Sequence, residues 1–153
     1  MHTIYTIGHS TRDIADFTAI LHTFDIQLLA DIRSMPGSGR HPQFNRFALE
    51  ISLKEAGLAY IHLPQLGGRG VAGTGYPKYM ETDIFKMDIK QLLTAAVDQR
   101  TAYMCAEALW SHCHRAHISD FLIIGGWQVI HIINKEKSIV HSCLSPVRQG
   151  DLF

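Results

Sequence analysis

The chain of 153 residues lacks several features that would assign a protein to a class at once. No apolar run approaches the roughly 20 residues that a membrane-spanning helix needs. No basic segment precedes an apolar one at the N-terminus, so no signal peptide is expected. The 14 basic and 14 acidic residues leave no excess charge that would favour nucleic acid or a membrane surface. These absences leave one ordinary globular domain as the prediction.

Cysteine is also scarce, with three residues, and no Cys-x-x-Cys pair occurs. An odd, small number of cysteines is typical of free thiols in a reducing compartment rather than of a disulfide framework. A cytoplasmic location is therefore predicted. Histidine, by contrast, is abundant, and the ten histidines would make the chain cationic below about pH 6.5.

Short apolar runs alternate with segments of helical spacing along the chain. Strands are predicted at residues 3–7, 27–32, 58–63, 101–106 and 127–133, with a short antiparallel edge strand at 138–141. Strands that alternate with helices indicate a parallel sheet with right-handed crossovers. We therefore expect an α/β fold: a single three-layer domain over residues 1–142, with a mostly parallel five-stranded sheet and helices on both faces.

Three further local predictions accompany this fold. Ser111 is a candidate N-cap for the helix that precedes the last parallel strand. The loops at residues 33–45 and 64–82 are long and glycine-rich, which is typical of functional or mobile connections. Pro146 and Gly150 predict an extended tail over residues 143–153.

Residues 105–115, Cys-Ala-Glu-Ala-Leu-Trp-Ser-His-Cys-His-Arg, contain most of the reactive side chains. They begin where a predicted strand ends and finish in the predicted first turn of a helix. Strand-to-helix junctions expose side chains to ligands in open α/β sheets. Cys113 is the better thiolate candidate, because a helix N-terminus and the adjacent Arg115 both favour the anion. Burial as a small apolar residue is the alternative for Cys113, and the more natural interpretation of Cys105.

Several motifs together resemble the bacterial domain-of-unknown-function family 488. They are Thr-Ile-Gly-His-Ser at 6–10, Asp-Ile-Arg-Ser-Met-Pro at 31–36, His-Leu-Pro-Gln-Leu-Gly-Gly at 62–68, Cys-Ala-Glu at 105–107, Cys-His-Arg at 113–115 and Val-Ile-His-Ile at 129–132. The resemblance runs from about residue 3 to about residue 141. It implies a small α/β domain and brings no established activity.

Parallel strands would bring their C-terminal ends, and the reactive side chains that follow them, to one edge of the sheet. Predicted there for acid, base or nucleophilic chemistry are Glu107, Cys113, His114 and His9. Arginines, hydroxyls and glycine backbone would suit a phosphate, and the predicted substrate-binding residues are Ser10, Arg33, Ser38, Gly67, Gly68, Arg69 and Arg115. An ion pair between Glu107 and Arg115 or Arg33 is the alternative for that carboxylate. His131 is expected at the same edge, or as a satisfied core histidine.

Spacing limits two sharper interpretations. A cysteine phosphatase needs an arginine six residues after its cysteine, whereas Arg115 follows Cys105 by ten positions and Cys113 by two. No metal site is predicted, although one could in principle be formed by Cys105, Cys113, His114 and His131.

The last five residues, Gln-Gly-Asp-Leu-Phe, resemble the short peptide by which bacterial repair and replication proteins dock on the sliding clamp. In such docking, Leu152 and Phe153 would fill an apolar pocket and Gln149 would fix the register by hydrogen bonds. Asp151 is also predicted to bind the clamp. Folding of Leu152 and Phe153 back onto the domain is the alternative.

Three functional hypotheses follow. The first is a small enzyme acting on a phosphate-bearing substrate, a nucleotide or nucleic acid. The second is a non-enzymatic nucleic-acid-binding accessory held at the sliding clamp. The third is a metal-binding protein. The sequence does not identify a cofactor.

Overall fold

The computed structural model describes residues 1–37, 39–68 and 75–142. Ser38, Arg69 and the predicted clamp-binding residues Gln149, Asp151, Leu152 and Phe153 lie outside the described residues. In the described part of the chain, no helix is both long enough and apolar enough to cross a membrane.

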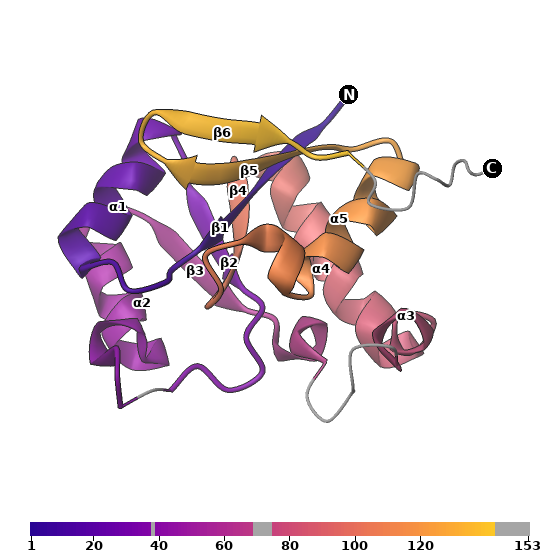
Figure 1. Cartoon of the computed structure of the whole chain (residues 1–153), viewed down its shortest axis with the longest axis horizontal. Helices are drawn as coiled ribbons and strands as arrows, with labels where there is room; N and C mark the ends of the chain where they lie inside the picture. The colour runs from indigo at the N-terminus through magenta and orange to yellow at the C-terminus, as the bar shows by residue number, and fades with distance from the viewer. Residues whose placement is uncertain (38, 69–74, 143–153) are drawn as a thin grey trace.

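A six-stranded sheet in the order β3-β2-β4-β1-β5-β6 forms the middle layer (Figure 1). Five strands are parallel: β1 (Thr3–Gly8), β2 (Leu28–Asp31), β3 (Ala59–His62), β4 (Thr101–Cys105) and β5 (Gln128–Asn134). The sixth, β6 (Lys137–Val140), pairs with β5 in the antiparallel direction. The predicted α/β class, the parallel sheet and the antiparallel edge strand are confirmed.

Helices cover both faces of the sheet. One face packs against α1 (Ile14–Thr23) and α2 (Arg46–Glu55) through a core that includes Phe17 and Leu49. The other packs against α4 (Asp83–Asp98) and α5 (Arg115–Ile124), with Phe85 and Ile118 in its core. The strands β2 and β4 are buried along their whole length because helices cover both faces of the sheet, as expected for a parallel sheet.

Local signals fix several helix ends. The side chains of Asp13 and Thr82 cap α1 and α4 by accepting hydrogen bonds from the backbone N–H groups of Asp16 and Phe85. Gly57, with φ of 80°, follows α2 in the left-handed conformation that glycine adopts without strain.

One local prediction was wrong. Ser111 does not cap α5, since it lies inside a short 3₁₀ helix, η4 (Trp110–His112), and α5 begins only at Arg115 with His114 as its N-cap. The two long loops contain regular turns: η1 (Pro42–Phe44), η2 (Pro64–Gly67) and the short helix α3 (Tyr76–Tyr79). Proline at the first position starts η1 and η2, because its fixed φ suits a helical turn.

Candidate functional site

The topology itself singles out one place on the sheet. β4 lies between β1 and β2, and the helices that follow β1 and β2 cover one face while the helix that follows β4 covers the other. At such a switch point the connections diverge, leaving a crevice where open α/β proteins bind ligands. We call the C-terminal ends of β1, β2 and β4 the switch-point edge. Two backbone hydrogen bonds extend the β1–β4 pairing into it, from His9 N to Cys105 O and from Ser10 N to Ala106 O, both 3.0 Å.

Cys105, the last residue of β4, forms a close pair with Cys113. The two Sγ atoms are 3.0 Å apart. Arg115 holds both, since its Nε lies 3.0 Å from Cys105 Sγ and 3.3 Å from Cys113 Sγ. Its backbone N–H donates to Cys113 Sγ as well, at 3.3 Å. Cys113 was predicted in the first turn of the helix, but it precedes the N-cap, and its sulfur accepts the first helical N–H.

This environment separates the acidities of the two thiols. The hydrogen bond from Cys105 and the charge and hydrogen bonds of Arg115 lower the pKa of Cys113 to about 6, against the opposing effect of burial. The same thiol–thiol hydrogen bond, together with burial, raises the pKa of Cys105. At neutral pH the pair is therefore a thiolate on Cys113 and a thiol on Cys105.

Arg115 is almost completely buried, with 1 % of its surface exposed. Its Nη2 donates to the carbonyl oxygens of Glu107 and Ala108, at 2.7 and 3.3 Å, and its Nη1 donates to Thr6 Oγ1 at 3.1 Å. Gly8 leaves room for this arrangement, because a Cβ there would lie 1.7 Å from the Glu107 carbonyl oxygen and 2.9 Å from Arg115 Nη2.

A buried chain of hydrogen bonds continues from Thr6, and we call it the Thr6–Asp120 chain. Thr6 Oγ1 lies 2.7 Å from His131 Nδ1, His131 Nε2 lies 2.8 Å from His141 Nδ1, and His141 Nε2 lies 2.7 Å from Asp120 Oδ1. Trp110 covers it, with its ring parallel to that of His131 at 4.3 Å.

Both ends of the Thr6–Asp120 chain set the direction of its protons. Arg115 can only donate, so Thr6 accepts from it and uses its own hydroxyl hydrogen toward His131. Asp120 accepts, so His141 donates from Nε2 and accepts at Nδ1. Burial, with the charges of His141 and Arg115, lowers the pKa of His131 to about 3, so its ring is neutral and donates from Nε2. The two ends demand the same tautomers, and every donor points from Arg115 toward Asp120.

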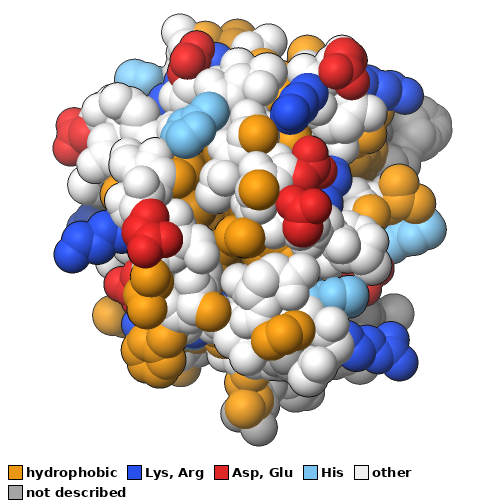
Figure 2. All heavy atoms as spheres, turned by 90° about the vertical axis from the view of Figure 1, so that its left-hand side faces the viewer, with side chains coloured by type: hydrophobic (Ala, Val, Ile, Leu, Met, Phe, Trp, Pro, Cys, Tyr) orange, Lys and Arg blue, Asp and Glu red, His pale blue; other side chains and the backbone are white. Residues whose placement is uncertain are grey.

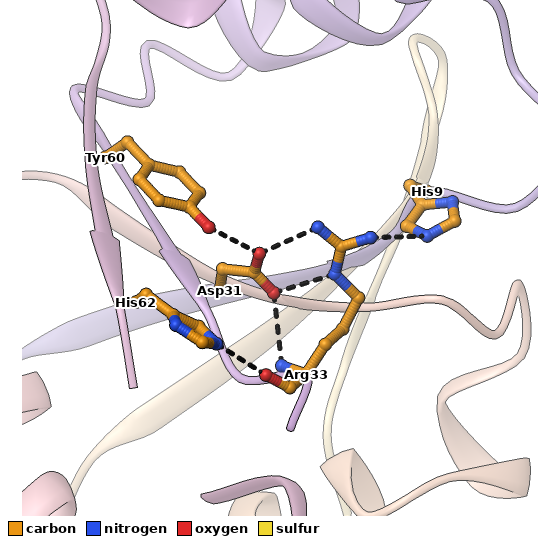
Figure 3. A network of polar contacts seen from close by, with 5 residues as sticks. All are labelled: His9, Asp31, Arg33, Tyr60 and His62. Atoms are coloured by element: carbon orange, nitrogen blue, oxygen red, sulfur yellow. Dashed lines mark hydrogen bonds and ion pairs between the residues drawn. The ribbon is translucent and has the colours of Figure 1, made fainter. Parts of the chain in front are cut away.

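A second polar cluster lies on the other face of the sheet, at the end of β2 (Figure 3). Arg33 forms a two-bonded ion pair with the fully buried Asp31, with Nε–Oδ1 and Nη2–Oδ2 distances of 2.9 and 2.8 Å. Tyr60 donates to the same carboxylate at 2.7 Å. His62 Nε2 donates to the Arg33 carbonyl oxygen, also at 2.7 Å.

His9 completes this cluster as a neutral ring. Its Nε2 lies 3.3 Å from Arg33 Nη1 and therefore accepts, while its Nδ1 donates to the Ser10 carbonyl oxygen at 2.9 Å. Burial lowers the pKa of His9 to about 4, and the charge of Arg33 contributes in the same direction. The ring stacks on Phe44 at 4.3 Å.

The turn at Gly67 and Gly68 contacts Ser34 on one side and Tyr76 and His114 on the other. Gly67 packs against Ser34, where a Cβ would come within 2.2 Å of the hydroxyl oxygen. Gly68, with φ of 63°, packs against the ring of Tyr76, on which His114 stacks at 4.0 Å. Burial lowers the pKa of His114, which forms a hydrogen bond with the Gly67 backbone.

The structure thus brings His9 together with Arg33, Cys113 with Arg115, and His114 with Gly67 and Gly68. Glu107 is exposed, and among the described residues its carboxylate has no ion pair; Arg115 contacts its carbonyl oxygen instead. His131 is fully buried within the sheet rather than placed at its edge. Arg115 is equally buried, so its guanidinium faces the thiols and not the solvent.

The residues named for a metal site do not form one in the described part of the chain, where no three histidine, cysteine or acidic side chains gather as ligands. Both His131 nitrogens are already used by Thr6 and His141. His114 lies with Tyr76 and Gly67 instead.

Sequence reasoning missed four residues that organise the two clusters: Thr6, Asp31, Asp120 and His141. Two left a signal. Asp31 and Arg33 are spaced two apart at a strand end, which puts both side chains on one face. Thr6 is a polar residue inside an apolar strand. Asp120 and His141 carry no such mark, because only the tertiary fold joins them.

Comparison with known proteins gives a family. The family described as Domain of unknown function DUF488 matches residues 13–122, and the chain belongs to it. No curated protein matches the sequence. No solved structure matches it either.

Proposed function

We propose that this member of the family is an enzyme that uses the Cys113 thiolate as a nucleophile on a phosphate-bearing substrate, a nucleotide or nucleic acid, bound at the switch-point edge. The observation that carries the proposal is the thiol pair, with its Sγ atoms 3.0 Å apart and both held by Arg115.

The geometry supports a nucleophile in two respects. Thiolates, not thiols, attack electrophiles, and a pKa of about 6 keeps Cys113 ionised at neutral pH. Cys113 is also only partly buried, unlike Cys105 and Arg115, so a substrate can reach its sulfur.

Support for an anionic substrate comes from Arg33. Three of its five N–H bonds are directed at Asp31 and His9, which leaves two without a partner among the described residues. Its side chain is 11 % exposed, so these donors can face a ligand. In contrast, the face formed by α1 and α2 mixes acidic, basic and apolar side chains and offers no single-sign surface (Figure 2).

The residues then take distinct roles. Cys113 sulfur bonds to the electrophilic atom of the substrate, whose leaving group departs with the bonding electrons. Water next displaces the sulfur, and Glu107, the exposed carboxylate that follows β4, accepts the proton of that water. Arg33 and Ser10 hold the phosphate, and His9 and His114 stay neutral beside it. Arg115, predicted as a substrate ligand, acts instead as the counterion of the thiolate.

Alkylation kinetics test this proposal without knowledge of the substrate. Cys143 is first replaced by serine, so that Cys105 and Cys113 remain the only thiols. We expect reaction with iodoacetamide to reach half its maximal rate near pH 6 and to vanish in Cys113→Ser. The ratio of the iodoacetate rate to the iodoacetamide rate should be higher for Cys113 than for glutathione. Inorganic phosphate should slow the alkylation of Cys113. A half-maximal rate near pH 8.5, the value of an ordinary thiol, would contradict the proposal.

For partners, we propose the bacterial sliding clamp, on the resemblance of residues 149–153 to its docking peptide. Binding of the full chain to purified clamp should be lost when Leu152 and Phe153 are both changed to alanine. Unchanged binding would reject the docking. If nucleic acid is the substrate, binding to DNA should weaken steeply with salt, because phosphate contacts release counterions.

We further propose a cytoplasmic location. Its support is the small, odd number of cysteines, which is typical of free thiols in a reducing compartment.

A further inference from the structure

The thiols of Cys105 and Cys113 lie closer together than a single reactive cysteine would need. Both are free, and their Sγ atoms lie 3.0 Å apart. A disulfide bond measures about 2.05 Å, so an approach of roughly 1 Å would join them. A thiolate nucleophile alone needs no second sulfur within reach.

The pair is also asymmetric in exposure. Cys113 is partly exposed, whereas Cys105 is 8 % exposed at the end of a central strand. Arg115 Nε contacts both sulfurs. An outer thiolate that meets the oxidant and an inner thiol that resolves the product is the arrangement that two-cysteine redox sites use.

We propose that Cys105 and Cys113 form a reversible redox site that reduces hydroperoxides. The Cys113 thiolate attacks the outer oxygen of the peroxide, the O–O bond breaks, and Cys113 becomes a sulfenic acid as the other oxygen leaves as an alkoxide or hydroxide and takes a proton. The Cys105 sulfur then attacks the sulfenic sulfur, and water leaves with the Cys105 proton. Two molecules of a low-molecular-weight thiol reduce the disulfide, become a disulfide themselves and restore the dithiol.

This inference uses the same thiolate as the proposed function but does not depend on its substrate. A disulfide would remove the nucleophile, so oxidation would also switch the proposed reaction off. It would further remove the anion that faces Arg115.

Hydrogen peroxide is the probe, applied to the full chain with Cys143→Ser. We expect the intact mass to fall by two hydrogens, both titratable thiols to disappear, and dithiothreitol to restore them. Cys105→Ser should stop at the sulfenic acid, which dimedone traps. Cys113→Ser and Cys113→Ala should react at least about tenfold more slowly, because the remaining thiol is not ionised. Circular dichroism establishes that each variant is folded.

Two outcomes would overturn the inference. One is accumulation of sulfenic or sulfinic acid on Cys113 in the chain that retains Cys105, since that means the inner thiol does not resolve it. The other is equal peroxide reactivity with and without Cys113. If iodoacetate still reacts with Cys113 near pH 6 in the first case, the proposed function stands while the redox inference fails. If Cys113 reacts neither with iodoacetate near pH 6 nor with hydrogen peroxide, both the proposed function and the redox inference fail.

Discussion

At the scale of single residues, the most demanding feature is the charge of Arg115. Buried charges need a compensating partner, because removal from water costs several kcal/mol. Within the described chain Arg33 forms an ion pair with Asp31, and no carboxylate forms one with Arg115. Its anion is therefore the Cys113 thiolate, so folding and thiol ionisation support each other.

Replacing Arg115 with lysine tests this pairing. An ammonium group has three donors against five, and cannot reach both sulfurs and the carbonyl oxygens together. We expect the pKa of Cys113 to rise from about 6 toward that of a free thiol, with a loss of about 1–3 kcal/mol in the free energy of unfolding. Alkylation against pH and urea denaturation measure the two. Arg100→Lys is the matched control, since Arg100 is exposed and contacts Phe24 and Tyr5 instead.

Gly8 provides a second test at this scale. An alanine there would place Cβ 1.7 Å from the Glu107 carbonyl oxygen and force the backbone of residues 107–108 away from Arg115. We expect the free energy of unfolding to fall by at least about 2 kcal/mol and Cys113 to lose reactivity at pH 7. Gly39→Ala, where nothing lies within 4 Å of the added carbon, should change stability by less than about 0.5 kcal/mol. Equal effects of the two changes would show that Gly8 is not a packing requirement.

At the scale of elements, the site depends on contacts between distant segments. The Thr6–Asp120 chain joins β1, β5, α5 and the residue after β6, and ends on the guanidinium that holds the thiols. Each element supplies one group, and none of them forms a site alone.

Thr6 is the link to alter. Thr6→Val keeps the shape but leaves Arg115 Nη1 and His131 Nδ1 without their buried partner, so we expect a loss of about 2 kcal/mol and a raised pKa of Cys113. Thr6→Ser retains the hydroxyl and should restore the thiol pKa. Urea denaturation of both variants measures the change in stability, and alkylation against pH measures the pKa of Cys113. A normal thiol profile in Thr6→Val would mean that the chain supports the fold but does not tune Cys113.

The sequence predicted the elements much better than the contacts between them. Apolar runs at residues 101–106 and 127–133 mark strands because burial is a local property of composition and spacing. The start of α5 was misplaced because Ser111 lies within a 3₁₀ turn and the N-cap is His114. A polar residue before an apolar helical segment marks both positions alike. The role of Arg115 as a buried partner of both thiols was not predictable, because its position two residues after Cys113 does not reveal that its side chain is buried. The pairing of Thr6 with His131 spans 125 positions, which no local pattern encodes.

At the scale of the whole molecule, neutral buried histidines make stability depend on pH. The pKa values of His9 and His131 are lowered to about 4 and about 3, while an unfolded chain protonates histidine near 6.5. Between these values the unfolded state binds more protons, so stability falls as pH is lowered from about 6.5.

Near pH 5 the two histidines should together give a slope of about 2.7 kcal/mol per pH unit in the free energy of unfolding. Denaturant titrations from pH 4.5 to 7 measure it. His131→Gln should reduce the slope by about half, whatever its effect on absolute stability. His22→Gln is the control, since His22 is exposed, and it should leave the slope unchanged. A slope that is the same in all three proteins would refute the assignment of these protons.

The place of His141 has a consequence for how the protein is made. It follows β6, so the ribosome delivers Cys105, Cys113 and Arg115 well before the residue that completes the hydrogen bonds of His131. Until β6 has paired with β5, the reactive half of the site exists without its support. Synthesis and folding therefore bring the thiolate to its final acidity only after β6 and His141 have been made.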